Sequence, residues 1–259
     1  MQQIVVFFCI VISLFVLMLA LMEIGRRAGV RRRRQEGEAA SDGLGTFDGA
    51  VFGLMGLLVA FTFSGATERF DARRHLIIQE TNAIGTAYLR IDLLPAAAQP
   101  TLRDDFRNYV DTRLAYYRTL HEDSEESRKN LERVTGLQGK IWSEAVAACE
   151  KARAPATPAL VLGALNEMID ITTTRAASLE MHPPKVVFWA LGILVLASAL
   201  LAGYGTSKAR TRAWLHMLLY SGILAMAVYL ILDLEYPRVG LIRIEATDHF
   251  LVDLRASMK

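Results

Sequence analysis

The sequence predicts an all-α membrane protein: four transmembrane helices in two hairpins, with a helical extramembrane domain inserted between the second and third spans. Four apolar runs each approach the ~20 residues that a helix needs to cross the hydrocarbon core of a bilayer. They lie in two pairs, separated by a long charged segment: residues 4–22, 44–66, 186–204 and 214–232. The chain is 53% hydrophobic yet 22% charged, and the charges are nearly absent from the four runs.

The elements follow in a simple order. A first transmembrane hairpin with an Arg-rich loop covers residues 1–66, and the helical extramembrane domain covers residues 67–183. A second hairpin at 184–236 and an amphipathic C-terminal segment at 237–259 complete the chain. The first run has no basic segment before it and no small-residue cleavage site after it, so it is an uncleaved anchor rather than a signal peptide.

Two basic segments set the expected orientation. One contains Arg31, Arg32, Arg33 and Arg34 after the first span, and the other lies between the third and fourth spans at residues 208–212. Because two spans separate these segments, both lie on one side of the membrane, and the positive-inside rule places that side in the cytoplasm. The termini and the helical domain are then predicted to be non-cytoplasmic, in a bacterial inner membrane.

The central domain is predicted to be helical throughout, because its apolar residues recur every three or four positions. The second span is expected to continue to Leu94, before Pro95. Further helices are expected to start near Pro100, at Ser124 as an N-cap, and at Thr157 as an N-cap followed by Pro158. A short amphipathic helix near the C-terminus would carry Phe250, Leu251, Leu254 and Met258 on one side.

Several classes of function have no support in the sequence. The net charge of +2 is too small to indicate a nucleic-acid-binding protein. There is no phosphate-binding loop, no nucleophile elbow and no Cys or His cluster with metal spacing, so we expect no enzyme activity, cofactor or metal.

Glu167 and Asp170 stand one helical turn apart, and we interpret them as a solvated face or an ion pair with Arg175. Asp233 and Glu235 end the fourth span and are expected at the interface or paired with basic residues of the domain.

The second span carries the candidate functional residues. At 100° per residue, one face collects the candidate pore-lining residues Asp48, Phe52, Gly56, Val59 and Phe63. The candidate helix-packing residues Gly45, Gly49 and Gly53 stand four apart, a spacing that lets helices approach closely. Either the glycines seat a neighbouring helix, or copies of this helix surround an axis where Phe52 and Phe63 form hydrophobic constrictions. The Asp48 side chain is expected to face a cavity or a partner, because placing an ionisable residue within a span is costly.

Four separated blocks, in order, resemble the bacterial bestrophin-like membrane proteins: Phe61–Arg74, Asn82–Pro95, Leu165–Ile171 and Ile231–Arg238. The resemblance covers nearly the whole chain after the arginine run. It implies a homo-oligomeric ion channel with four spans per subunit, a pore lined by the second helix, and a pentamer rather than a tetramer. Bestrophins keep their helical domain in the cytoplasm, which is opposite to the orientation that the arginines predict here.

The function predicted from the sequence is therefore a homo-oligomeric ion channel whose partners are the lipid bilayer, inorganic ions and copies of itself. The alternative is a non-conducting membrane scaffold or sensor that binds a partner through its helical domain.

Overall fold

The structure, a computed structural model, describes residues 2–36, 44–119, 125–208, 212–237, 240–242 and 244–259. It is built of α-helices joined by short 3₁₀ turns, and the described residues contain no strand. The α-helices are α1 (Gln2–Glu36), α2 (Leu44–Arg90), α3 (Gln99–Thr119), α4 (Glu125–Cys149), α5 (Thr157–Glu180), α6 (Lys185–Gly205), α7 (Trp214–Glu235) and α8 (His249–Ser257). The 3₁₀ turns are η2 (Ile91–Leu93), η3 (Thr206–Lys208) and η4 (Glu245–Asp248).

The prediction of an all-helical chain with long apolar helices is confirmed. Four helical segments are long and apolar enough to cross a membrane, and they contain α1, the first part of α2, α6 and α7. The chain divides into two compact units, which are described separately: residues 1–70 with 182–242, and residues 71–181 with 243–259.

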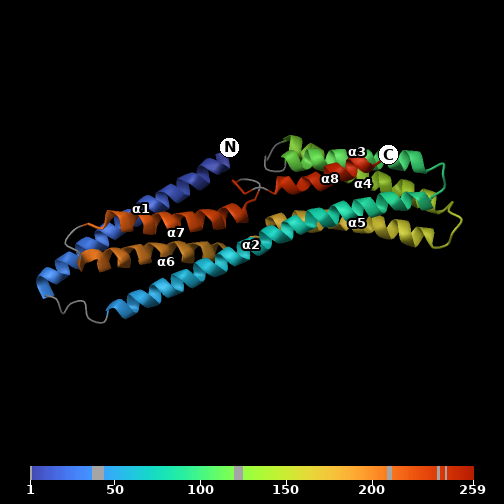
Figure 1. The fold of residues 1–259 in the computed structure, drawn as a ribbon. Helices are drawn as coiled ribbons and strands as arrows, with labels where there is room; N and C mark the ends of the chain where they lie inside the picture. Colours follow the sequence, from blue (N-terminus) through green and yellow to red (C-terminus); the bar gives the residue numbers. More distant parts are fainter. Residues whose placement is uncertain (1, 37–43, 120–124, 209–211, 238–239, 243) are drawn as a thin grey trace. The chain divides into compact units, whose positions relative to one another are not determined.

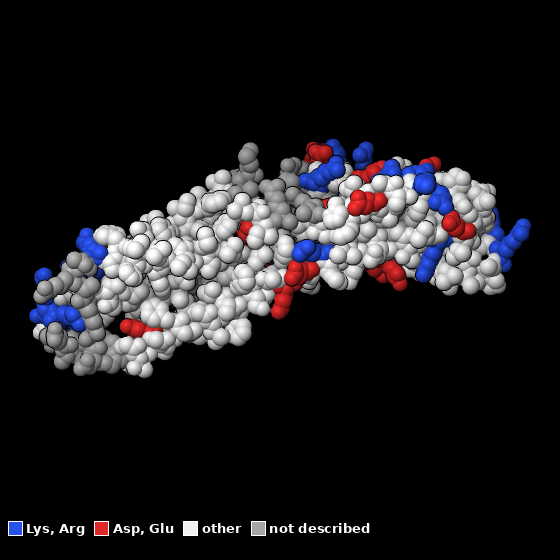
Figure 2. Space-filling view, viewed as in Figure 1, with Lys and Arg blue, Asp and Glu red and all other residues white. Residues whose placement is uncertain are grey.

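The first unit consists of α1, the N-terminal part of α2, α6 and α7 (Figure 1). Helix α1 packs against both α6 and α7. Their shared core contains Met18, Met22, Val195, Met217 and Ile231. On the face that Figure 2 shows, this unit carries few charged side chains, and basic ones gather at one end.

Two glycines let α1 and α6 approach closely. A Cβ atom added at Gly25 of α1 would lie 2.0 Å from the carbonyl oxygen of Leu200, and one added at Gly203 of α6 would lie 2.0 Å from that of Met22. Contacts this short do not occur between real atoms, so only glycine fits at either position. Gly25 and Gly203 thus make a close helix contact within this chain, and the packing role of Gly45, Gly49 and Gly53 stays a prediction.

The second unit packs the C-terminal part of α2 with α3, α4, α5 and α8 (Figure 1). Helices α3 and α4, α4 and α5, and α3 and α8 are neighbours. The core is rich in aromatic and branched side chains, among them Phe106, Tyr109, Ile141 and Leu165. Leu251 and Met258 are buried in this core and Leu254 packs against it, whereas Phe250, which was expected on the same side of the helix, is 38% exposed.

Several predicted helix ends differ from the structure. The arginines at 31–34 belong to the last turns of α1 rather than to a loop, because arginine is a strong helix former and its charge suits the C-terminal end of the helix dipole. Helix α2 ends at Arg90 and continues as the 3₁₀ turn to Leu93. Ala156, not Thr157, is the N-cap of α5, so Thr157 lies inside the helix. The predicted N-cap Ser124 lies outside the described residues.

Candidate functional site

Helix α2 runs for 47 residues, and its apolar first half carries the candidate pore-lining residues. The structure does not place these five side chains alike. Phe52 and Val59 are half-buried and pack against the core shared with the other apolar helices. The Phe52 ring meets the ring of Tyr220 of α7 edge to face, with centroids 6.3 Å apart. Gly56 and Phe63 are exposed, and Asp48 is intermediate.

The candidate packing glycines face no other helix among the described residues. A Cβ added at Gly45, Gly49, Gly53 or Gly56 would meet no described atom within 4 Å. This stretch of α2 is therefore free to approach something other than its own chain, and whether that is a second copy remains a prediction.

The exposed part of α2 divides into two stripes of different chemistry. One, which we call the small stripe, comprises Gly49, Gly53, Gly56, Ala60, Phe63 and Ser64. The other, the large apolar stripe, comprises Leu54, Leu57 and Phe61, whose side chains are each more than half exposed. Leucine and phenylalanine suit contact with lipid tails, whereas small and polar residues are typical of helix contacts or of a hydrated path.

Glu235 lies at the end of α7, completely buried, and contacts Arg69 and His182. Nε of Arg69 of α2 donates to one carboxylate oxygen at 2.9 Å, and Nη2 lies 2.9 Å from the same oxygen. His182 Nδ1 lies 2.8 Å from the other carboxylate oxygen. Removing a charge from water costs several kcal/mol unless it is paired, so this arrangement stabilises a carboxylate at the end of an apolar helix. The expectation that Glu235 pairs with a basic residue is confirmed.

Asp233, two residues earlier on α7, has different hydrogen-bond partners. Its two carboxylate oxygens accept hydrogen bonds from the backbone amides of Leu241 and Ile242, each at 2.8 Å. A Cβ at Gly240 would overlap the Asp233 carboxylate, so glycine is required at this close approach. Among the described residues, Asp233 therefore has backbone donors of the following segment rather than a basic partner, and its place at the interface stays a prediction.

The second unit contains a buried charge cluster that sequence reasoning missed. Glu80 of α2, completely buried, accepts from Nε of Arg113 at 2.8 Å on one oxygen and from the Tyr117 hydroxyl at 2.7 Å on the other. Arg175 of α5 also donates to Glu80, and its second Nη atom donates to Asp248 at 3.2 Å. The predicted ion pair of Arg175 with Glu167 or Asp170 does not form. Asp170 instead accepts from Asn166 at 2.8 Å.

The sequence offered no local signal for this cluster, since its members come from α2, α3 and α5 and are far apart along the chain. Burial also changes the pKa of groups in the second unit. It raises the pKa of Tyr109 to about 12. The Tyr109 hydroxyl accepts a hydrogen bond from Gln138. Burial also raises the pKa of Glu144, helped by the nearby negative charge of Asp105.

The described residues contain no group of three or more His, Cys, Asp or Glu side chains that could hold a metal ion. Cys9 is exposed and Cys149 is buried, and both are free thiols.

Two of the arginines near the end of the second span make structural contacts. Arg69 pairs with Glu235, and Arg73 donates to the carbonyl oxygens of Ser178 and Met181 at the end of α5.

The comparisons with known proteins agree with one another. The bestrophin-like domain family matches residues 6–248. Among solved structures, a variant of a bacterial bestrophin homologue from Klebsiella pneumoniae is 16% identical with a TM-score of 0.69, and covers 95% of this chain and 99% of that chain. A second variant of that homologue is 17% identical with a TM-score of 0.71, over 95% and 98% of the two chains. A third structure, described as a membrane protein, is 17% identical with a TM-score of 0.69, over 95% and 99%.

No curated protein matches the chain by sequence. The identities to the solved structures are low and show the fold alone, whereas the family match extends over almost the whole chain. With four helices able to cross a bilayer, the chain is a membrane protein that belongs to the bestrophin-like family.

Proposed function

We propose that this protein is a homo-oligomeric ion channel whose pore is lined by the first half of α2. Bestrophins form ion channels, and the bestrophin-like fold spans nearly the whole chain. The observation that carries the proposal is the small stripe of α2, which lies open on an apolar helix while the large apolar stripe occupies another side.

In this proposal the pore surface is centred on Gly56 and Phe63. Phe52 and Val59 lie at its edge, where α2 meets the rest of its own subunit, and Asp48 forms a polar ring towards the start of the helix. Gly45, Gly49 and Gly53 would let neighbouring copies approach closely. A ring of phenylalanine side chains restricts a hydrated path because water leaves a narrow apolar constriction.

Phe63 and Phe61 provide a matched test. Two positions apart on a helix, they point about 200° away from each other, so one lies on the small stripe and the other on the large apolar stripe. Both are exposed in the single chain, by 43% and 66%. In liposomes loaded with a halide or a monovalent cation, Phe63→Ala should raise ion flux, whereas Phe61→Ala should leave it at the wild-type level.

Asp48→Asn should change the ratio of cation to anion permeability if Asp48 lines the path. Equal flux from the two phenylalanine variants would contradict the assignment of the pore face. Flux no greater than that of empty liposomes, for wild type and every variant, would refute conduction and support the scaffold or sensor function.

The number of subunits and the orientation belong to the same proposal. We favour a pentamer over a tetramer on the basis of the family, which the mass of the detergent-solubilised complex would test.

The two hairpins, with the domain of residues 67–183 inserted between them, place both basic segments on one side of the membrane. The positive-inside rule makes that side the cytoplasm, so the termini are non-cytoplasmic. Cytoplasmic reporter activity from fusions at Lys259 would contradict this orientation and support the one that bestrophins adopt.

A further inference from the structure

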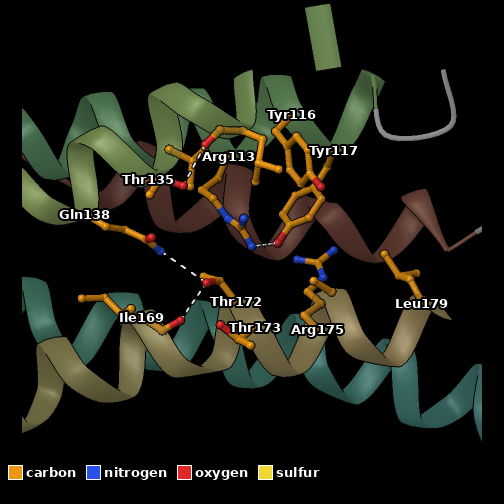
Figure 3. A pocket seen from close by; sticks show the side chains of 13 residues that line it. Arg113, Tyr116, Tyr117, Thr135, Gln138, Ile169, Thr172, Thr173, Arg175 and Leu179 are labelled. Carbon is orange, nitrogen blue, oxygen red and sulfur yellow. Dashed lines mark hydrogen bonds between the residues drawn. The ribbon is translucent and has the colours of Figure 1, made fainter. Parts of the chain in front are cut away.

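A cavity of about 330 Å³ opens between α3, α4 and α5 in the second unit (Figure 3). Its volume falls at the lower end of the ~300–1,000 Å³ typical of small-molecule sites. All of its lining residues belong to the second unit, and none is a candidate pore-lining residue of α2.

One wall of the cavity is basic. Arg113 and Arg175 are both lining residues, and none of the lining residues is acidic. Both arginines are almost fully buried, with 3% and 4% of their surfaces exposed. Figure 3 shows their guanidinium groups converging on the same part of the cavity, from α3 on one side and α5 on the other, with Tyr117 beside them.

Some donors of these guanidinium groups are unused. Glu80, which does not line the cavity, receives Nε and Nη2 of Arg113 and Nη1 of Arg175. Asp248 receives Nη2 of Arg175. Among the described residues, no hydrogen bond involves Nη1 of Arg113 or Nε of Arg175. Neither atom is among the fully enclosed polar atoms that lack a partner, so both remain accessible to an acceptor bound in the cavity.

The remaining walls are mainly apolar. Leu131 and Val134 of α4 and Ile169 of α5 supply aliphatic surface. Gln138 and Thr172 add a polar pair between these helices, joined by a hydrogen bond of 3.3 Å. An apolar chamber with a few donors at one end is typical of sites for small amphipathic molecules.

We propose that this cavity binds a small organic monocarboxylate with a short aliphatic chain. Its carboxylate would accept hydrogen bonds from the free N–H groups of Arg113 and Arg175, because charge-assisted bonds between guanidinium and carboxylate are the strongest available there. The aliphatic chain would lie against Leu131, Val134 and Ile169. Arg113 and Arg175 each keep one N–H group outside the hydrogen bonds described above, and two N–H groups match the two oxygens of a single carboxylate.

Titration calorimetry on the full-length protein in detergent micelles tests this proposal, with empty micelles as the blank for partitioning. Sodium hexanoate should bind saturably. Hexylamine has the same chain with a positive charge, and hexanamide is its neutral counterpart; neither should bind with comparable affinity. Sulfate, which carries two charges and no chain, should not bind. Absence of saturable hexanoate binding, or equal affinity for hexanamide or hexylamine, would overturn the proposal.

Two neighbouring alanines on α5 place the ligand in this cavity. Ala176 lines it, whereas Ala177 does not, and both are exposed and outside the charge cluster. Ala176→Trp should fill the cavity mouth and weaken hexanoate binding about tenfold or more, which corresponds to ~1.4 kcal/mol. Ala177→Trp should bind like the wild type. Equal affinities of the two variants would place the ligand elsewhere and refute the site. The experiment does not depend on whether the protein conducts ions.

Discussion

Replacing Gly203 by alanine should weaken the contact between α1 and α6 severely. The added Cβ would lie 2.0 Å from the Met22 carbonyl oxygen and 2.5 Å from the Met22 Cα. Both are backbone atoms that cannot rotate away, so the two helices would have to separate by about 1 Å to restore ordinary van der Waals contact. Overpacking of this kind costs up to ~3 kcal/mol. At ~2–4 °C per kcal/mol for a chain of this size, Gly203→Ala should lower the melting temperature by roughly 6–12 °C.

Gly192 provides the control on the same helix, because a Cβ there would meet no described atom within 4 Å. Gly192→Ala should leave stability unchanged or raise it by ~0.5–1 kcal/mol, since alanine loses less backbone entropy than glycine. The measurement is the fraction of protein that elutes as the native species in size-exclusion chromatography after heating in detergent. Equal melting temperatures for Gly203→Ala and Gly192→Ala would refute the close approach of α1 and α6.

Three further changes test the buried polar groups. Glu80→Gln should destabilise the second unit by ~3–5 kcal/mol, because Arg113 and Arg175 would stay buried beside a neutral amide; an unchanged melting temperature would contradict the cluster. Asp233→Asn should cost ~1–3 kcal/mol and speed proteolysis of the segment after α7, because one of two backbone amides loses its acceptor; wild-type proteolysis would count against this anchor. Because burial raises the pKa of Tyr109 to about 12, against ~10 for an unfolded tyrosine, wild-type stability should fall by up to ~3 kcal/mol as the pH rises from about 10 to 12. Tyr109→Phe should lose less stability over that range, and identical pH profiles would argue against a buried neutral hydroxyl.

The features that the sequence predicted correctly are those written into contiguous segments. An apolar run of bilayer length, or apolar residues at helical spacing, depends only on neighbours along the chain, so the four long apolar helices and the helical central domain followed from pattern alone. The family resemblance also rested on contiguous blocks and is confirmed over residues 6–248.

Residue-level assignments were less accurate where they depended on partners far along the chain. Nothing in the local sequence distinguishes Gly25 and Gly203, which meet another backbone, from Gly49, which meets no described atom. Likewise Arg175 lies one helical turn from Asp170 and two from Glu167, yet it pairs with Glu80 of α2.

The sequence by itself determined that this chain has four helices long and apolar enough to cross a membrane, because the hydrophobic effect acts on whole segments and needs no knowledge of their neighbours. Only the tertiary structure decided which glycines carry a helix crossing, which carboxylates are neutralised by arginines, and where two buried guanidinium groups line a cavity. Such contacts depend on distances of a few ångströms between residues far apart in the chain, and these distances are fixed only when the helices pack.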